Sequence, residues 1–266
     1  MKKHYVKTSN FHRFNDGIQA VEERGAAEAS MMLVFGNAGY GKSETLDHWA
    51  TQNDAIYLRA NVDWTSKYFL IELAKFLRID ASGTSEQLFT RLMAKIAAEQ
   101  MPIVIDEADH CLHNNAAVLE KVRDFADRTE TLVILAGMEK IQGKIARHPQ
   151  ISSRIARAVE FSAATVEDTI KLCDELCEVK VHQALAAEMQ KQSAGRVREI
   201  LNAIALVERT GQRAGKAEVT IADMAGQALT HDWQSRRQRV VQATARVVSA
   251  ASGSGAARTG DMKGAR

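Results

Sequence analysis

The sequence predicts an α/β fold in which a five-stranded parallel sheet is flanked by helices and followed by a small helical domain. Three observations lead to this prediction. A glycine-rich loop at 36–43 follows the short apolar run 31–35. Two adjacent acids, Asp106 and Glu107, follow a second apolar run rich in β-branched residues. Runs of strand length alternate with helical periodicity as far as Phe161, and the strand pattern then fades.

Length and composition fit a protein with one α/β core and a smaller second domain. The chain has 266 residues, of which 45% are hydrophobic and 26% charged, as in soluble globular proteins. No apolar run approaches the ~20 residues of a membrane span, and the first residues are polar. The three cysteines are an odd number without a repeated pair spacing, which favours reduced thiols. We therefore expect a cytoplasmic protein with no membrane partner.

The net charge of +2 conceals an asymmetry along the chain. Residues 231–266 carry seven Lys or Arg against two acids, so the remainder has 28 basic against 31 acidic residues. A basic tail on a mildly acidic body indicates a polyanionic partner, because such charges release counterions from phosphates. A disordered, solubilising terminus explains the same composition.

Residues 1–30 precede the first strand, and 16–24 can form a helix. Val6 and Phe14 are candidates for contact with a nucleotide base, although such residues more often cover the sheet. The strand at 31–35 and a helix at 43–51 then enclose the glycine-rich loop.

This loop has the phosphate-binding pattern G-x-x-x-x-G-K-[ST] in Gly36, Gly41, Lys42 and Ser43. Glycines let the backbone turn its N–H groups toward phosphate oxygens, and the following helix adds its positive end. Lys42 would reach the β- and γ-phosphates of ATP, and Ser43 would offer a hydroxyl to Mg²⁺. The strand and helix around the pattern make a chance match much less frequent than for the bare pattern. The predicted nucleotide-binding residues of the loop are Gly36, Asn37, Ala38, Gly39, Tyr40, Gly41, Lys42, Ser43 and Glu44.

A second strand is predicted at 55–60, and two structural helices at 68–78 and 85–98. Lys67, at the start of the first of these helices, is a candidate for contact with DNA.

The run 101–110 places Asp106 at the carboxyl end of a buried strand, where open α/β sheets bind ligands. An acid there can hold Mg²⁺, and Glu107 can polarise the attacking water. Paired acids are common on surfaces, but the phosphate loop about 65 residues upstream makes the combination specific. His110 and His113 beside Cys111 invite a metal site, although solvated loop histidines are more frequent.

The rest of the core is predicted as a helix at 115–128, a strand at 131–136 ending at Gly137 and Met138, and an edge strand at 157–161. Helices are predicted at 166–179, 181–192, 196–210 and 221–229. The domain limits are therefore 1–162 for the nucleotide-binding core, 163–230 for a helical lid, and 231–266 for a basic, partly disordered tail.

In their order, these motifs resemble the AAA+ ATPases over about residues 5–230. They are the lead-in, the phosphate loop, the acid pair, the strand to Gly137, an arginine after a polar turn, and a helical lid with G-R-V-R at 195–198. The start Y-V-K-T-S-N-F and the compact size look most like the DNA transposition protein B group of Mu-like phages.

This resemblance implies roles for two arginines. Arg154 would reach the γ-phosphate bound by a neighbouring subunit and stabilise the transferring phosphoryl group, with Arg147 or Arg157 as alternatives. Arg198 aligns with the lid's sensor arginine, and Arg196 is the alternative. Many members also carry a polar sensor near the end of the fourth strand, where this chain has Gly137 and Met138. Either that function is missing or a nearby residue serves, so hydrolysis is expected to be slow.

The function that the resemblance implies is an ATPase, stimulated by DNA or a partner, that binds double-stranded DNA with little sequence preference. It would assemble into a homo-oligomeric filament or ring and direct a transposase to target DNA, in the cytoplasm of a bacterial host if a phage encodes it. A replication initiator or helicase loader is the alternative within the superfamily. A nucleotide-gated protein-interaction switch that never touches DNA is a rival from another class. A small-molecule kinase is disfavoured, because the acid pair and the lid fit attack by water better.

Overall fold

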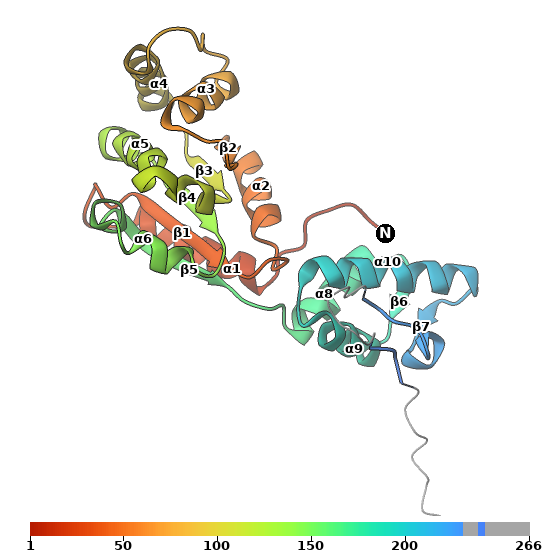
Figure 1. Ribbon diagram of the computed structural model, residues 1–266. Coiled ribbons are helices and arrows are strands. Elements are labelled where there is room, and N and C mark those ends of the chain that lie inside the picture. Colours follow the sequence, from red (N-terminus) through yellow and green to blue (C-terminus); the bar gives the residue numbers. More distant parts are fainter. Residues whose placement is uncertain (231–238, 243–266) are drawn as a thin grey trace, which may run out of the picture.

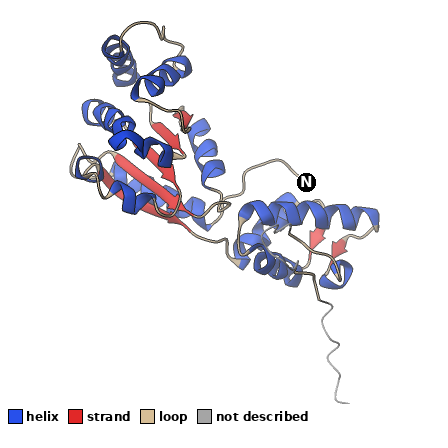
Figure 2. Ribbon diagram, viewed as in Figure 1, coloured by secondary structure: helices blue, strands red, loops and turns tan. Residues whose placement is uncertain are grey.

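The computed structural model describes residues 1–230 and 239–242, and its core is a five-stranded sheet with helices on both faces (Figures 1 and 2). All neighbouring strands are parallel, in the order β2-β3-β4-β1-β5. The strands are β1 (Met31–Gly36), β2 (Ile56–Arg59), β3 (Ile103–Asp106), β4 (Val133–Gly137) and β5 (Ile155–Phe161). The predicted fold class, a five-stranded parallel sheet flanked by helices, is confirmed.

The helices of the core lie between these strands in the chain. They are α1 (Ser9–Glu22), α2 (Lys42–Gln52), α3 (Ser66–Phe76), α4 (Ser85–Glu99), the 3-10 helix η1 (Ala108–Leu112), α5 (His113–Thr129), α6 (Ile141–Ile145) and α7 (Pro149–Ser152). Side-chain caps fix the starts of two of them, because Thr65 accepts the amide of Tyr68 and Thr84 forms a capping box with Gln87.

Alternation along the strands sends side chains into two separate cores. On one face, Met32 and Val34 of β1 pack with Phe14 of α1 and Trp49 of α2. On the other face, Leu33 packs with residues of α3, α4 and α5. Burial on both faces explains why these strands are continuous apolar runs. The sheet therefore holds its carboxyl ends, where the predicted motifs lie, at one rigid edge.

The boundaries of several elements differ from the sequence prediction. α1 begins at Ser9 instead of residue 16, since Phe11, Phe14 and Ile18 form one buried helical stripe. α5 spans His113–Thr129, but left-handed φ at 114–116 interrupts its first turn, so the regular helix begins after the predicted start at residue 115. The edge strand β5 begins two residues earlier than predicted, because Ile155 still pairs with Met31 of β1.

The C-terminal part contains three helices, α8 (Val166–Leu176), α9 (Gln183–Ser193) and α10 (Val197–Arg213), around a core of their own. The sequence reading missed two short parallel strands there, β6 (Lys180–Val181) and β7 (Glu218–Val219), because two residues carry no periodicity. The helix predicted at 221–229 is wrong. Only the 3-10 turn η2 (Ile221–Met224) forms, with its start capped by Thr220 and Asp223. Val241 packs into the same core and pairs with Gln227, while most of the predicted basic tail lies outside the described residues.

The segment from Tyr5 to Ser9, the first residue of α1, joins the C-terminal helices to the core. The buried carboxylate of Asp168 on α8 accepts the Ser9 amide at 2.7 Å and the Ser9 hydroxyl at 2.6 Å. Tyr5 donates to or accepts from Thr45 of α2 at 2.8 Å and stacks on His48. The segment therefore contacts α8 through Asp168 and α2 through Thr45, and it connects α8 to the helix that follows the phosphate loop. Among the described helices none is both long and apolar enough to cross a membrane.

Candidate functional site

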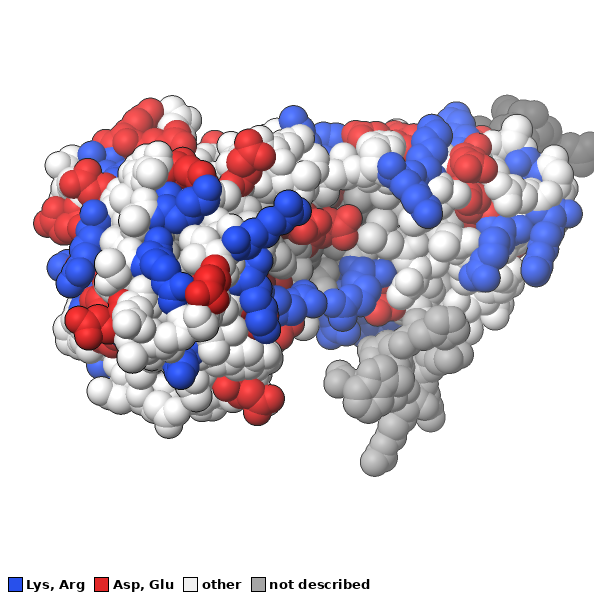
Figure 3. All heavy atoms as spheres, turned by 90° about the horizontal axis from the view of Figure 1, so that it is seen from above, with Lys and Arg blue, Asp and Glu red and all other residues white. Residues whose placement is uncertain are grey.

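A cavity of about 840 Å³ lies at the carboxyl edge of the sheet and is bounded on one side by α10. In space-filling view, the molecule is hollowed between the core and the C-terminal helices, with side chains of both charges at the rim (Figure 3). The lining combines the glycine-rich loop, the ends of β2, β3 and β4, and the start of α10. The lining residues are Asn37, Ala38, Gly39, Gly41, Lys42, Ser43, Glu44, Arg59, Asp106, Glu107, Asp109, His110, Gly137, Met138, Glu139, Lys140, Lys144, Val197, Arg198, Leu201 and Asn202.

The loop has the geometry of a phosphate cradle. Gly36 has φ 150°, and a Cβ there would stand 2.3 Å from the carbonyl oxygen of Phe161, so only glycine fits against β5. Gly41 is the N-cap of α2 with φ 88°, a left-handed value that glycine adopts without strain. The first amides of α2 and its dipole therefore face the cavity at a point suited to an anion.

Lys42 closes this loop on itself. Its Nζ donates to the carbonyl oxygens of Gly36 at 2.7 Å and Asn37 at 2.9 Å. Burial lowers the pKa of the Lys42 ammonium, and the carboxylates of Asp106 and Asp109 act in the opposite direction. The ammonium group is thus held inside the loop and is able to exchange its carbonyl partners for phosphate oxygens.

Asp106 is the most connected acid of the site. Its side chain is only 3% exposed, and it accepts from the hydroxyl of Tyr57 at 2.8 Å and from the Glu107 amide at 2.8 Å. Burial, followed by the charge of Asp106, raises the pKa of the Tyr57 phenol, so this hydroxyl stays protonated as a donor. The carboxylate is therefore fixed at the end of β3.

Arg59, at the end of β2, lies among the residues predicted to hold Mg²⁺. Its guanidinium approaches Asp106 at 3.3 Å, Glu107 at 3.5 Å and the Ser43 hydroxyl at 3.5 Å. One cation thus bridges the hydroxyl and the carboxylate that would bind the metal. These oxygen ligands suit a hard divalent cation, and the bridging arginine marks the place where positive charge is stabilised.

Two arginines follow Gly195, at the start of α10. Arg198 lines the cavity, and its amide donates to the carbonyl oxygen of Gly39 at 3.3 Å. Arg196 is the N-cap of α10, and its side chain lies beside Gly39 outside the lining of the cavity. The start of α10 is therefore in direct contact with the loop.

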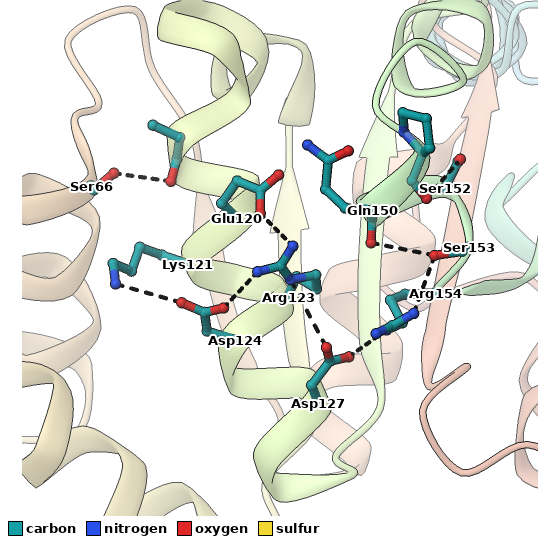
Figure 4. A network of polar contacts seen from close by, with 12 residues as sticks. Ser66, Glu120, Lys121, Arg123, Asp124, Asp127, Gln150, Ser152, Ser153 and Arg154 are labelled. Carbon is teal, nitrogen blue, oxygen red and sulfur yellow. Dashed lines mark hydrogen bonds and ion pairs between the residues drawn. The ribbon is translucent and has the colours of Figure 1, made fainter.

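Arg154 lies where the strands begin, at the end of the sheet opposite the glycine-rich loop. Figure 4 shows it beside Asp127 and Ser153. Its carbonyl oxygen accepts from Met31 at the beginning of β1, whereas the loop begins at the end of that strand. The rise of β1 separates these edges by roughly 17 Å. The guanidinium of Arg154 donates to Asp127 at 2.8 Å, and this contact raises the pKa of Arg154. Arg123 of α5 belongs to the same network, with Glu120 and Asp124 as closer partners (Figure 4).

The structure brings together most of the residues predicted from the sequence. Of the loop residues, Gly36 and Tyr40 do not line the cavity, since Tyr40 packs against the core on the α1 face. Val6 is buried in the core of the C-terminal helices and Phe14 in the core on the α1 face of the sheet. Neither residue lines the cavity. Lys67 is exposed in the first turn of α3.

Among the residues that sequence reasoning missed are Tyr57, Arg59, Asp109 and Lys144, which make the polar contacts of the site. The position of Arg59 at the end of a predicted strand was a usable signal, because it places the side chain at the same edge as Asp106. Asp109 and Lys144 come from η1 and α6, and no local pattern indicates that they meet.

Comparison with known proteins agrees with this geometry. Residues 25–145 match the AAA domain family. Among solved structures, Cdc6p from Pyrobaculum aerophilum is similar with a TM-score of 0.59 and 14% identity, over 84% of this chain and 68% of that one. The Aeropyrum pernix Orc1 protein, solved in complex with DNA, gives a TM-score of 0.54 and 15% identity, and the match covers 82% of this chain and 63% of that one.

Domain III of the Thermotoga maritima replication initiation protein DnaA gives a TM-score of 0.53 at 14% identity, over 80% of this chain and 88% of that domain. A search of curated protein sequences found no significant match. At such identities, likeness to solved structures concerns the fold. The chain therefore has the AAA+ P-loop fold, and its residues 25–145 are similar to the AAA domain family.

Proposed function

We propose that this chain is an ATPase that binds ATP in the cavity between the glycine-rich loop and α10. The observation that carries the proposal is the convergence of Lys42, Asp106, Glu107 and Arg198 on one cavity at the carboxyl edge of a parallel sheet. Its volume of about 840 Å³ lies within the usual range for nucleotide-sized ligands. The loop amides and Lys42 would bind the phosphates, and Val197 and Leu201 offer an apolar wall for the base.

Ser43 and Asp106 would hold Mg²⁺, which when bound neutralises phosphate charge. Arg59 must give up its contacts to these two residues for that to occur. Glu107 would accept a proton from the attacking water. Because Arg59 also contacts Glu107, release of the arginine frees the metal ligand and the general base together.

The finger role of Arg154 requires a second copy of the chain. Within one chain Arg154 lies at the sheet edge opposite the loop, so it cannot complete its own site. To act on a phosphate, a side chain at that end of the strands would have to reach the cavity of a neighbouring subunit. We therefore propose a homo-oligomer in which ATP lies between subunits and Arg154 leaves Asp127 to contact the γ-phosphate.

The role that we propose for this assembly is nucleotide-dependent binding of double-stranded DNA and delivery of that DNA to a transposase. Support for DNA binding comes from the excess of basic residues at 231–266 and from the likeness in fold to an Orc1 protein solved with DNA. The fold likeness to Cdc6p and DnaA favours the alternative, a replication initiator or helicase loader.

A gel shift on unrelated duplexes tests the proposal. Wild-type protein with ATP and Mg²⁺ should retard DNA at low salt, and the shift should weaken as salt rises. Lys42→Ala should abolish the shift, while deletion of 243–266, which keeps the buried Val241 in place, should weaken it without loss of ATP binding. ATP binding without any shift would leave a nucleotide-gated switch, and failure to bind ATP would refute the whole proposal. Pull-down of a transposase or of a replicative helicase would then separate the two DNA roles.

A further inference from the structure

The tip of β4 carries no polar side chain of its own at the cavity wall. Gly137 ends this strand and Met138 follows it, and both line the cavity. A Cβ on Gly137 would stand 2.5 Å from Oδ2 of Asp109 and 2.3 Å from Cδ1 of Ile141. The missing side chain therefore leaves room that a carboxylate from another element fills.

Asp109 occupies that room from η1. Its Oδ2 accepts the Met138 amide at 2.7 Å, and its Oδ1 accepts Nζ of Lys144 at 3.0 Å. The side chain of Asp109 is 17% exposed, whereas that of Lys144 is 50% exposed. The Asp109 carboxylate is thus bound to the backbone just after β4. It also binds Lys144, whose side chain lines the cavity.

Lys144 shares the cavity wall with the residues that would meet the terminal phosphate. It lines the cavity together with Lys42, Asp106 and Glu107. Asp109, the partner of Lys144, is close enough to Lys42 for its carboxylate charge to oppose the lowering of that lysine's pKa by burial. Lys42 would reach the β- and γ-phosphates, while Asp106 and Glu107 would serve the metal and the attacking water at the γ-phosphate. The last phosphate of the nucleotide would then be the one nearest to Lys144.

We propose that Lys144, held by Asp109, contacts the terminal phosphate of ATP and makes the site prefer a triphosphate to a diphosphate. This inference rests on the proposed function, because it names the group that senses the γ-phosphate in the same cavity. Lys144 is a binding residue in this scheme, and Asp109 is its positioning residue. The lysine keeps its bond to Asp109 through one N–H and has two further N–H donors for phosphate oxygens.

Fluorescent analogues of ADP and of a non-hydrolysable ATP, titrated with Mg²⁺ present, provide the test. Lys144→Ala should weaken the triphosphate by roughly 10- to 100-fold and change the diphosphate by less than about twofold, as expected for loss of a charged hydrogen bond. Lys144→Arg should keep most of the preference. Lys180→Ala is a matched control, because it removes a lysine that pairs with Glu218 at 3.3 Å in the β6–β7 sheet.

The inference is wrong if Lys144→Ala binds both nucleotides like wild type, or weakens both equally. The Lys144 side chain is half exposed, so Lys144→Ala should fold, and an unchanged thermal melting curve checks this. Should one variant melt early, Lys144→Met retains the aliphatic stem and removes only the charge. Failure of the wild type to bind either analogue would instead refute the proposed function itself.

Discussion

Replacement of Arg59 by alanine should make nucleotide binding less dependent on Mg²⁺ concentration. The guanidinium bridges Ser43 and Asp106, the two residues proposed as metal ligands, at 3.5 Å and 3.3 Å. A metal ion and this arginine compete for the same oxygens. In the variant, Asp106 keeps the Tyr57 hydroxyl and the Glu107 amide, so the carboxylate stays in place without the competing charge.

The magnitude follows from the exposure of the pair. Arg59 is 56% exposed, which places the interaction near the values for surface ion pairs, about 0.2–1 kcal/mol. Coulomb's law at this separation with the screening of water gives about 1 kcal/mol, in agreement with the upper end. The midpoint for Mg²⁺ should therefore fall by up to roughly fivefold, since about 1.4 kcal/mol corresponds to a factor of ten.

The assay is a Mg²⁺ titration of fluorescent ATP-analogue binding at fixed protein concentration. Arg209→Ala serves as the control, because Arg209 is exposed on α10 and its Nε donates only to the carbonyl oxygen of Ala205. Arg59→Lys should lie between wild type and Arg59→Ala. A midpoint that stays unchanged or rises in Arg59→Ala would refute the competition, and it would indicate that Arg59 binds phosphate instead.

Four further predictions follow from the same geometry. Lys42→Ala should weaken ATP binding at least about tenfold in calorimetry, because a charged donor is lost from the loop; binding within twofold of wild type would contradict the assignment. Glu107→Gln should keep ATP affinity but slow phosphate release by about 100-fold or more, and unchanged turnover would place the base elsewhere. Arg154→Ala should lower turnover by about 1,000-fold only at concentrations where subunits associate, so an equal loss in dilute monomer would exclude the finger role. Asp168→Ala should lower the free energy of unfolding by about 2 kcal/mol in urea titrations, because the Ser9 amide and hydroxyl lose their buried acceptor; a loss below about 0.5 kcal/mol would contradict this account.

The sheet could be predicted because its strands are buried on both faces. Burial on both sides demands continuous apolar runs, and such runs stand out beside glycine and paired acids. The weaker predictions concern elements that tertiary contacts decide. The residues 221–229 have an apolar content suited to a helix, yet Thr220 and Asp223 fix a single turn and Leu229 packs into the lid core. The strands β6 and β7 form only because their partners meet across the fold.

The site could be predicted only in part, for a related reason. Gly36, Lys42 and Ser43 act within eight residues of chain, so their spacing is visible in the sequence. Asp106 and Glu107 are marked by the strand that precedes them. Lys144 and Arg59 gain their positions from contacts with acids 35 and 47 residues away, and spacing alone does not indicate such pairs.

Four of the cations to which we assign a role already have a partner within the chain. Lys42 binds two loop carbonyls, Arg59 binds Asp106, Lys144 binds Asp109, and Arg154 binds Asp127. Binding of a triphosphate is therefore an exchange of partners, so the net gain per contact is smaller than the contact itself. The exchange would free Asp106 beside the loop, and it would free Asp127 at the opposite end of the strands, where we propose that the next subunit binds. Asp127→Ala should thus strengthen binding between subunits, because it releases Arg154 for the neighbour's phosphate, whereas Arg154→Ala should weaken that binding. If both variants changed the binding in the same direction, the pair of Arg154 with Asp127 would only stabilise the fold.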